Sequence, residues 1–153
     1  MPITIRPATS QDAERFTEIL IQSRATFLPF AKSPHTDAAM HLWVREKLLP
    51  HAKCYVAQDE QSRLLGILAL ESNATGNWIE QLYLCPQHVA QGIGTQLLHF
   101  ALRQLSLPIR LYTFQQNFGA RRFYERHGFR AIAWSNGAEN EERCADVLYE
   151  LTA

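Results

Sequence analysis

The chain has 153 residues, of which 46% are apolar and 20% are charged, as is typical of one globular domain. Its 15 basic and 15 acidic side chains cancel, so it lacks the basic excess of a protein that binds nucleic-acid phosphates. No stretch approaches the ~20 apolar residues of a membrane span, and no signal-peptide core is present. Three widely spaced cysteines argue against a disulfide framework and a zinc site. We therefore expect one cytoplasmic domain over residues 1–153, with no metal, membrane or nucleic-acid partner.

The charges are balanced in sum but not in position. Residues 103–130 hold six arginines and one acid, whereas residues 139–150 hold five acids and one arginine. Solvent-exposed helix faces and loops would account for both charged segments. The alternative is one surface for an anionic ligand and a separate surface for a cationic ligand, because summed fields of this kind guide small charged molecules.

The expected elements alternate between strands and helices. Thr36 is a helix N-cap, Pro50 ends the helix that begins there, and Gly128 suits the C′ position of a later helix. In chain order we expect a strand near 3–6, helices from 9 or 10 and over 36–49, strands over 53–58, 64–72 and 78–85, a helix from 92, a strand over 109–114, a helix over 117–127, and a hairpin of strands 129–134 and 145–151. The unbroken apolar run at 64–70 indicates a central strand. Together these elements predict an α/β (α+β) domain with helices on a mixed, mostly antiparallel sheet.

A strand runs into a glycine-containing turn within residues 78–98. Gly92 and Gly94 allow a ligand to approach the backbone closely, and the free N–H groups of the following helix can hold a phosphate. Packing glycines in a tight turn are the alternative. The dinucleotide fingerprint G-x-G-x-x-G fails at Leu97, and the lysine of a triphosphate-binding loop is missing. The turn therefore favours a pyrophosphate that does not belong to a nucleoside triphosphate.

Two motifs here resemble those of the GNAT superfamily of N-acetyltransferases, which bind acetyl-CoA. Residues 89–94 resemble [Q/R]-x-x-G-x-[G/A], with Val89 in place of Gln or Arg and Ala90 where a glycine is frequent. Residues 117–129 resemble N-x-x-A-x-x-[F/L]-Y-x-x-x-G-F, and one helix and one strand separate the motifs as in the family. The resemblance covers residues 78–130. It implies the acyl-CoA N-acyltransferase fold, with acetyl-CoA as co-substrate.

The resemblance also implies which residues hold the cofactor. In the family, one strand parts from its neighbour and offers its backbone to the pantetheine arm, and here the Leu84 N–H would face the acetyl carbonyl oxygen. Asn117 would contact the cofactor, although an ordinary N-cap role is also open. The implied cofactor-binding residues are Leu82, Tyr83, Leu84, Val89, Gln91, Gly92, Ile93, Gly94, Thr95, Asn117, Ala120 and Phe123.

Direct transfer of an acetyl group to an amine needs a base and a proton donor. The resemblance places the phenol of Tyr124 near the sulfur, as the donor. Glu80 is the candidate base, directly or through a water, because it is the one carboxylate of an apolar strand. Alternation places Glu80 on one face with Trp78 and Leu82 unless a bulge intervenes. A helix tyrosine with a buried ring and an edge carboxylate are the structural alternatives.

The acceptor pocket is expected between the 25–35 loop, the second helix and the C-terminal hairpin. Phe27 and Phe30 are candidate lining residues, although both would also suit a core. The hairpin resembles a tail, D-G-x-x-N-E-E-x-x-P-D-x-x-Y, of a subgroup of bacterial GNAT proteins of unsettled substrate, with Asn136 for the Asp and Ala145 for the Pro. Its acids would suit a cationic amine; they are Glu141, Glu142 and Asp146.

Two functions of different classes remain open. The first is acetyl transfer in a ternary complex to a primary amine of a small cationic acceptor, or to an amine of a peptide or protein. The second is a sensor or regulator that binds acyl-CoA without turnover. Tyr124 favours the enzyme, because a binding module has no use for a proton donor. The resemblance also implies a homodimer as one possible assembly.

Overall fold

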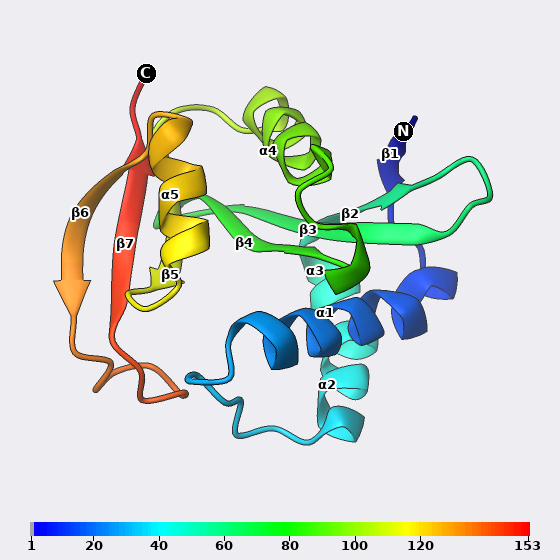
Figure 1. The fold of residues 1–153 in the computed structure, drawn as a ribbon, viewed down its shortest axis with the longest axis horizontal. Coiled ribbons are helices and arrows are strands. Elements are labelled where there is room, and N and C mark those ends of the chain that lie inside the picture. The colour runs from blue at the N-terminus through cyan, green and yellow to red at the C-terminus, as the bar shows by residue number, and fades with distance from the viewer. Residues whose placement is uncertain (1) are drawn as a thin grey trace.

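The computed structural model describes residues 2–153 as one seven-stranded sheet with helices on both faces (Figure 1). The elements in chain order are β1 (Thr4–Pro7), a 3₁₀ turn (Ser10–Asp12), α1 (Ala13–Phe27), α2 (Asp37–Trp43), a π turn (Val44–Leu48), α3 (Leu49–His51), β2 (Lys53–Gln58), β3 (Leu64–Asn73), β4 (Gly76–Leu84), a 3₁₀ turn (Pro86–His88), α4 (Ile93–Gln104), β5 (Ile109–Phe114), α5 (Phe118–Arg126), β6 (Arg130–Ser135) and β7 (Asp146–Leu151). This order matches the expected one.

The sheet runs β1-β2-β3-β4-β5-β7-β6. Neighbouring strands are antiparallel except β4 and β5, which are parallel. The expected mixed, mostly antiparallel sheet is therefore confirmed. Residues 64–70 of β3 are buried throughout, because helices cover both faces of this part of the sheet, as the unbroken apolar run indicated.

Two clusters of apolar side chains hold the helices to the sheet. On one face, Leu97 and Leu98 of α4 pack in a cluster that includes Leu68 of β3. On the other face, Phe16 and Ile19 of α1 pack in a second cluster with other side chains of β2 and β3. The sheet therefore sits between α4 and α5 on one side and α1 and α2 on the other (Figure 1).

The second helix does not end at Pro50, contrary to expectation. Thr36 caps it as expected, with its hydroxyl accepting from the Ala39 N–H at 3.1 Å. A π turn over Val44–Leu48 then leads into α3, which contains Pro50 and ends at His51. A proline ring clashes with the carbonyl four residues earlier in a regular α-helix. The wider π turn moves that carbonyl away, so the helical path continues through the proline.

The strands β4 and β5 separate soon after they begin. They pair only through Asn77 with Ile109 and Trp78 with Arg110. Beyond this point β4 carries a bulge: Ile79 lies opposite Leu70 and Gln81 opposite Ala69, so Glu80 is the extra residue.

The bulge overturns the simple alternation expected for β4. Trp78 pairs with Glu71 and Leu82 pairs with Leu68, which are three residues apart on β3. Trp78 and Leu82 therefore lie on opposite faces of the sheet. Glu80 does not share one face with both, because the extra residue shifts the alternation at that position.

Candidate active site

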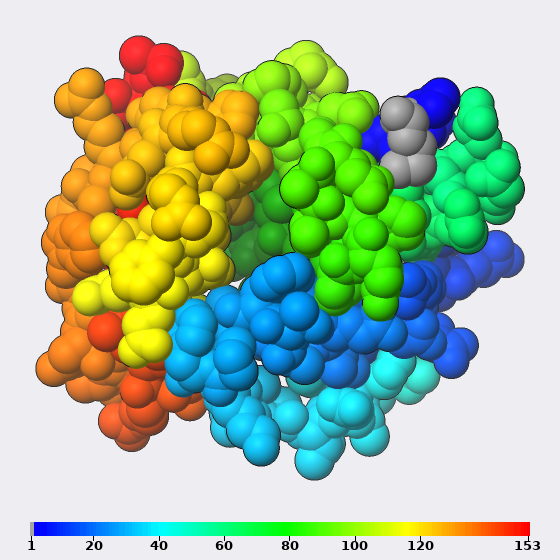
Figure 2. Space-filling view, in the orientation of Figure 1, coloured from blue at the N-terminus to red at the C-terminus, as the bar shows by residue number. Residues whose placement is uncertain are grey.

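The gap between β4 and β5 holds two adjoining cavities. The larger, about 700 Å³, lies beside the β6–β7 hairpin and is called the hairpin cavity. The smaller, about 620 Å³, lies beside the turn before α4 and is called the glycine-turn cavity. In the space-filling view the surface is hollowed between α5 and the segment that leads into α4 (Figure 2). Both cavities share one set of lining residues, namely Leu28, Leu82, Tyr83, Asn117 and Ala120.

The backbone of β4 presents free groups to this cleft. The Cys85 N–H donates to the Leu65 carbonyl of β3 at 2.8 Å. The direction of N–H groups alternates along an extended strand, so the N–H groups of Leu82 and Leu84 point away from β3 and toward the cleft. This is the orientation that the expected roles of these two residues require.

The glycine turn is open in front of α4. Gly92 is the N-cap of α4 at φ +82°, and a side chain added there would meet nothing within 4 Å. A Cβ at Gly94 would meet only ordinary contacts, the nearest being Leu84 at 3.6 Å. Neither glycine is needed for packing. The first N–H groups of α4, including those of Ile93 and Thr95, have no partner within the helix and are available to an anion.

Ala90 occupies a position where related motifs often have glycine, and the backbone conformation at this position explains the preference for glycine. Its φ is +60°, a left-handed conformation that costs an L-residue about 1 kcal/mol or more. Ala90→Gly is expected to raise the free energy of unfolding by about 0.5 kcal/mol, since the removed strain exceeds the added entropy of the unfolded chain. Urea unfolding measures this. The control Ala74→Gly, at an exposed position without positive φ, is expected to lower stability. A loss of stability in Ala90→Gly would contradict the assigned strain.

The expected cofactor residues mostly gather at the cleft. Val89, Gly92, Gly94, Thr95 and Phe123 line the glycine-turn cavity. Asn117 caps α5 by accepting from the Ala120 N–H at 3.3 Å, and it lines both cavities. The Ile93 side chain is buried in the core, so only the backbone of Ile93 is available to a ligand. Gln91 is exposed and lines neither cavity.

Arg126 also lines the glycine-turn cavity and is its one basic lining residue. It was not among the cofactor-binding residues expected from the motifs. Its place in an arginine-rich stretch was the available signal, and the last turn of α5 brings it to the cavity. It adds positive charge to the side where a pyrophosphate would lie.

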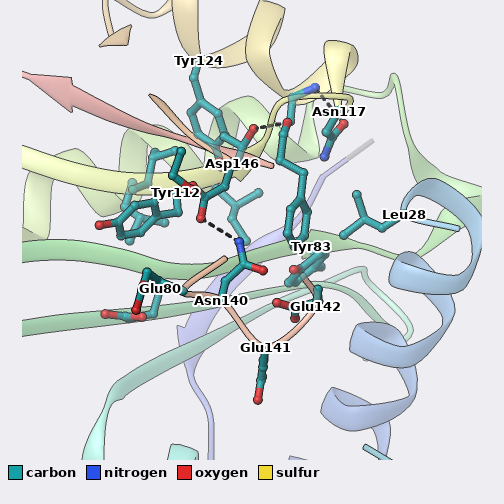
Figure 3. Close-up of a pocket in the computed structure, with 18 residues that line it drawn as sticks. Leu28, Glu80, Tyr83, Tyr112, Asn117, Tyr124, Asn140, Glu141, Glu142 and Asp146 are labelled. Atoms are coloured by element: carbon teal, nitrogen blue, oxygen red, sulfur yellow. Dashed lines mark hydrogen bonds between the residues drawn. The ribbon is translucent and has the colours of Figure 1, made fainter. Parts of the chain in front are cut away.

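Tyr124 lies in α5 with its side chain toward the hairpin cavity (Figure 3). The residue is 7% exposed, and its ring packs edge-on against Phe123 and Phe129, with ring centroids 5.1 and 5.5 Å away. Within residues 2–153, its hydroxyl makes no hydrogen bond. Burial, and secondarily Tyr83, raise the pKa of Tyr124 well above its ordinary value. The phenol therefore stays protonated at neutral pH.

Glu80 reaches the same cavity from the bulge in β4 (Figure 3). Desolvation within the cleft, followed by the neighbouring carboxylate of Glu71, raises the pKa of Glu80 above the ordinary carboxyl value. The side chain nevertheless stays accessible from solvent. A carboxylate with a raised pKa and access to the cavity has the properties of a general base.

The charged side chains that line the hairpin cavity are all acidic. Its lining contains no lysine, arginine or histidine and five carboxylates, namely Glu80, Glu139, Glu141, Glu142 and Asp146. The three acids expected from the tail are therefore brought together, and Glu139 joins them. Tyr112 and Phe114 of β5 also line this cavity.

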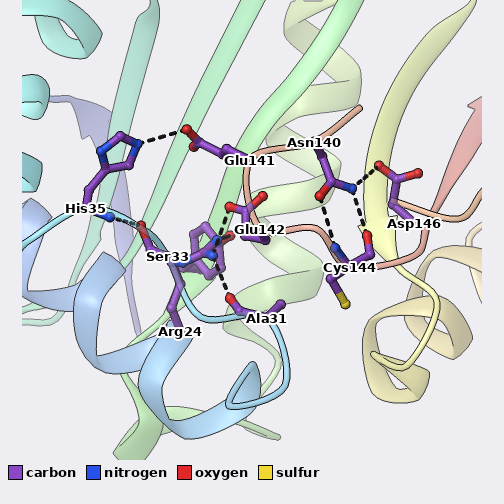
Figure 4. Close-up of polar contacts among 10 residues, drawn as sticks. Arg24, Ala31, Ser33, His35, Asn140, Glu141, Glu142, Cys144 and Asp146 are labelled. Atoms are coloured by element: carbon purple, nitrogen blue, oxygen red, sulfur yellow. Dashed lines mark hydrogen bonds and ion pairs between the residues drawn. The ribbon is translucent and has the colours of Figure 1, made fainter. Parts of the chain in front are cut away.

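Two of these acids have basic partners behind the cavity wall (Figure 4). Glu142 forms an ion pair with Arg24 of α1 at 3.2 Å, and both side chains are at most 15% exposed. Arg24 also donates to the Ala31 carbonyl and to the Tyr83 hydroxyl. Glu141 contacts His35 at 2.8 Å on an exposed surface. These contacts fasten the hairpin to α1 and the loop after it.

Gly137 allows the hairpin to fold back on itself. Its φ is +86°, and a Cβ there would lie 2.4 Å from the backbone carbonyl carbon of Cys144. Gly137→Ala is expected to lower the free energy of unfolding by about 2 kcal/mol. Urea unfolding measures this change. Gly119→Ala, where the added carbon meets nothing within 4 Å, is the stability control. Equal stabilities of the two variants would contradict the clash.

Neither of the two phenylalanines expected to line an acceptor pocket lines the hairpin cavity. Phe27 lines the glycine-turn cavity. Phe30 lines neither cavity and packs edge-on against Phe114, with ring centroids 6.4 Å apart. The helix α1 ends at Phe27, and the spacing of apolar residues in the sequence does not predict the direction that the chain takes after a helix ends.

Within residues 2–153, no helix is both long and apolar enough to cross a membrane. No group of three or more His, Cys, Asp or Glu side chains in this part of the chain is arranged to hold a metal ion.

The chain was compared with known families and structures. The profile of the acetyltransferase (GNAT) domain matches residues 50–131, more than half of the chain. No curated protein sequence matches.

Three solved structures share the fold. The apo form of YjaB from Escherichia coli has 22% identity, coverage of 98% of this chain and 97% of that chain, and a TM-score of 0.78. The PaiA N-acetyltransferase of Thermoplasma acidophilum, in complex with coenzyme A, has 23% identity, complete coverage of both chains and a TM-score of 0.75. The ribosomal-protein-S18-alanine N-acetyltransferase of Escherichia coli has 14% identity, coverage of 99% and 94%, and a TM-score of 0.76. At these identities the likeness concerns the fold alone. With the domain profile, it establishes that the chain belongs to the GNAT family of acetyltransferases, whose acetyl donor is acetyl-CoA.

Proposed function

We propose that this protein transfers the acetyl group of acetyl-CoA to a primary amine of a small cationic acceptor, by direct attack in a ternary complex. The observation that carries the proposal is the juxtaposition of the two cavities. One has a glycine turn with free N–H groups and Arg126. The other has five carboxylates and, among residues 2–153, no basic lining side chain and no partner for the phenol of Tyr124. A cation is attracted to the second cavity and an anion to the first.

The residues of the glycine-turn cavity fit the donor. Gly92 leaves open space in front of α4, and the N–H groups at the start of this helix suit a pyrophosphate. Val89 and Phe123 offer apolar surface beside it. Acetyl-CoA, when bound, supplies an activated acetyl thioester.

Each remaining role falls to a group of this chain. The Leu84 N–H donates a hydrogen bond to the acetyl carbonyl oxygen, where negative charge develops. Glu80 accepts the proton that the acceptor nitrogen loses as the new C–N bond forms. The Tyr124 hydroxyl donates a proton to the sulfur as the C–S bond breaks. Asn117 and the backbone of β4 fix the relative positions of the two substrates.

Isothermal titration tests the donor half of this proposal. Wild-type protein is titrated with acetyl-CoA, and with NADH and ATP as controls. Binding of acetyl-CoA alone at micromolar strength, about −8 kcal/mol, is expected. No heat, or equal heat from all three, would contradict a site built for acetyl-CoA and would mean that Val89 has removed the usual phosphate affinity.

A further inference from the structure

We propose that the acceptor is a linear dication, a diamine or polyamine, and that Asp146 binds its second ammonium group. This inference rests on the proposed function and deepens it. The proposed function requires one amine, which reacts beside Glu80. The structure assigns a separate carboxylate to a second positive charge.

The assignment follows from which carboxylates already have a basic partner. Glu142 is paired with Arg24 in a nearly buried contact, and Glu141 is paired with His35. Within residues 2–153, Glu80, Glu139 and Asp146 have no basic nitrogen within 4.0 Å. Glu139 is exposed in the loop between β6 and β7, whereas Asp146 is partly buried at the start of β7. The cavity therefore keeps uncompensated negative charge beyond the single carboxylate that a general base requires.

Asp146 is held in place without being neutralised. The Asn140 amide donates to it at 3.1 Å, and the Ser135 hydroxyl also donates to it. Asn140 is itself fixed, because it donates to the Cys144 carbonyl at 2.7 Å and accepts from the Cys144 N–H at 3.1 Å (Figure 4). These donors are neutral, so the carboxylate keeps its full charge in a fixed position. Such a group suits an ammonium ion.

Glu80 and Asp146 lie at different depths of the cavity. Counted from the Asn77–Ile109 pair, Glu80 is three residues along β4, whereas Asp146 pairs with Phe114, five residues along β5. At ~3.3 Å per residue this offset of two residues is about 7 Å along the strands, and the divergence of β4 from β5 adds to it. Leu82, Leu111 and Tyr112 also line the cavity. Apolar and aromatic side chains suit the methylene chain between two ammonium groups.

The phenol of Tyr124 is a second sign that this cavity suits a ligand. The residue is more than nine-tenths buried, lines the cavity and lacks a hydrogen-bond partner among the described residues. Its hydroxyl oxygen is not one of the enclosed polar atoms without a partner, so it opens to the cavity, where a ligand can bond to it. Together with the unpaired carboxylates, this points to a bound molecule that combines a reacting group with positive charge.

The test compares acceptors that differ only at the far end. Initial rates are measured with acetyl-CoA and three series of equal chain length: α,ω-alkanediamines, amino alcohols and n-alkylamines. We expect kcat/KM for the best diamine to exceed that for its amino alcohol and alkylamine about tenfold or more, as for a hydrogen bond between charged groups. Asp146→Asn keeps the side-chain shape and is expected to bring the ratio of kcat/KM for the diamine to kcat/KM for the alkylamine down to about one. Glu60→Gln, in an exposed turn distant from the cavity lining, is the control and keeps the preference.

The possible outcomes separate this inference from the proposed function. Equal kcat/KM for diamines and alkylamines would overturn the dication inference and leave amine acetylation standing. A diamine preference that survives in Asp146→Asn would overturn the role of Asp146. Acetyl-CoA binding without acetylation of any amine would overturn the proposed function and the inference together. Equal losses for diamine and alkylamine in Asp146→Asn would show a structural role only, and would also overturn the assignment.

Discussion

Tyr124→Phe is expected to lower kcat about 10²-fold while the fold and acetyl-CoA affinity stay the same. The variant removes one hydroxyl, and a positioned proton donor contributes a factor of this size or more. The ring keeps its packing against Phe123 and Phe129. Because the hydroxyl makes no hydrogen bond within residues 2–153, its loss leaves no partner unsatisfied in the protein. Steady-state kinetics, urea unfolding and titration with acetyl-CoA measure the three quantities.

The pH dependence sharpens this prediction. The pKa of Tyr124 lies well above its ordinary value, so the donor remains protonated throughout the neutral and mildly alkaline range. The wild-type rate should therefore show no loss from Tyr124 up to about pH 10. Turnover of the phenylalanine variant equal to wild type at every pH would remove Tyr124 from the mechanism.

Glu80→Gln is expected to lower kcat/KM by about 10²-fold at neutral pH and to abolish the acid limb of the pH–rate profile. A general base works only when deprotonated, so the wild-type rate falls as the pH falls through the pKa of Glu80. Desolvation and Glu71 raise that pKa, which places the limb above the ordinary carboxyl range. Initial rates across the pH range measure both effects.

The matched control is Glu71→Gln, which leaves the base in place but removes the neighbouring carboxylate. Its acid limb should shift to lower pH, because one cause of the raised pKa of Glu80 is gone. An acid limb that survives unchanged in Glu80→Gln would show that the base lies elsewhere.

The elements that local sequence determines were predicted closely. The strands over 53–58 and 109–114 have the expected limits, because apolar alternation and flanking turn residues specify them. Asn117 caps α5 and Gly128 has φ +92° after it, as their positions in the motif indicated. The continuation of the second helix past Pro50 was not predicted, because it depends on a π turn that no residue pattern announces.

The candidate site was only partly predictable, because its decisive features are long-range. The bulge at Glu80 appears only when β4 pairs with β3. The neutralisation of Glu142 depends on Arg24, which is 118 residues away in the chain. From the run of acids alone, Glu142 was expected to carry an unpaired negative charge, which its ion pair with Arg24 contradicts. The same run gave no reason to prefer Asp146 over the other acids. Backbone roles, such as that of Leu84, follow from the motif because every residue other than proline has the same backbone N–H.

The most direct test of acetyl transfer at this site is product analysis of wild-type protein with acetyl-CoA and the amine panel. Release of free thiol is measured in parallel with the mass of each amine. The account predicts one thiol released for each acetyl group gained by a cationic primary amine, with diamines reacting fastest. Tight binding of acetyl-CoA without acetylation of any amine in the panel would contradict it, and would instead indicate a module that binds acyl-CoA without turnover.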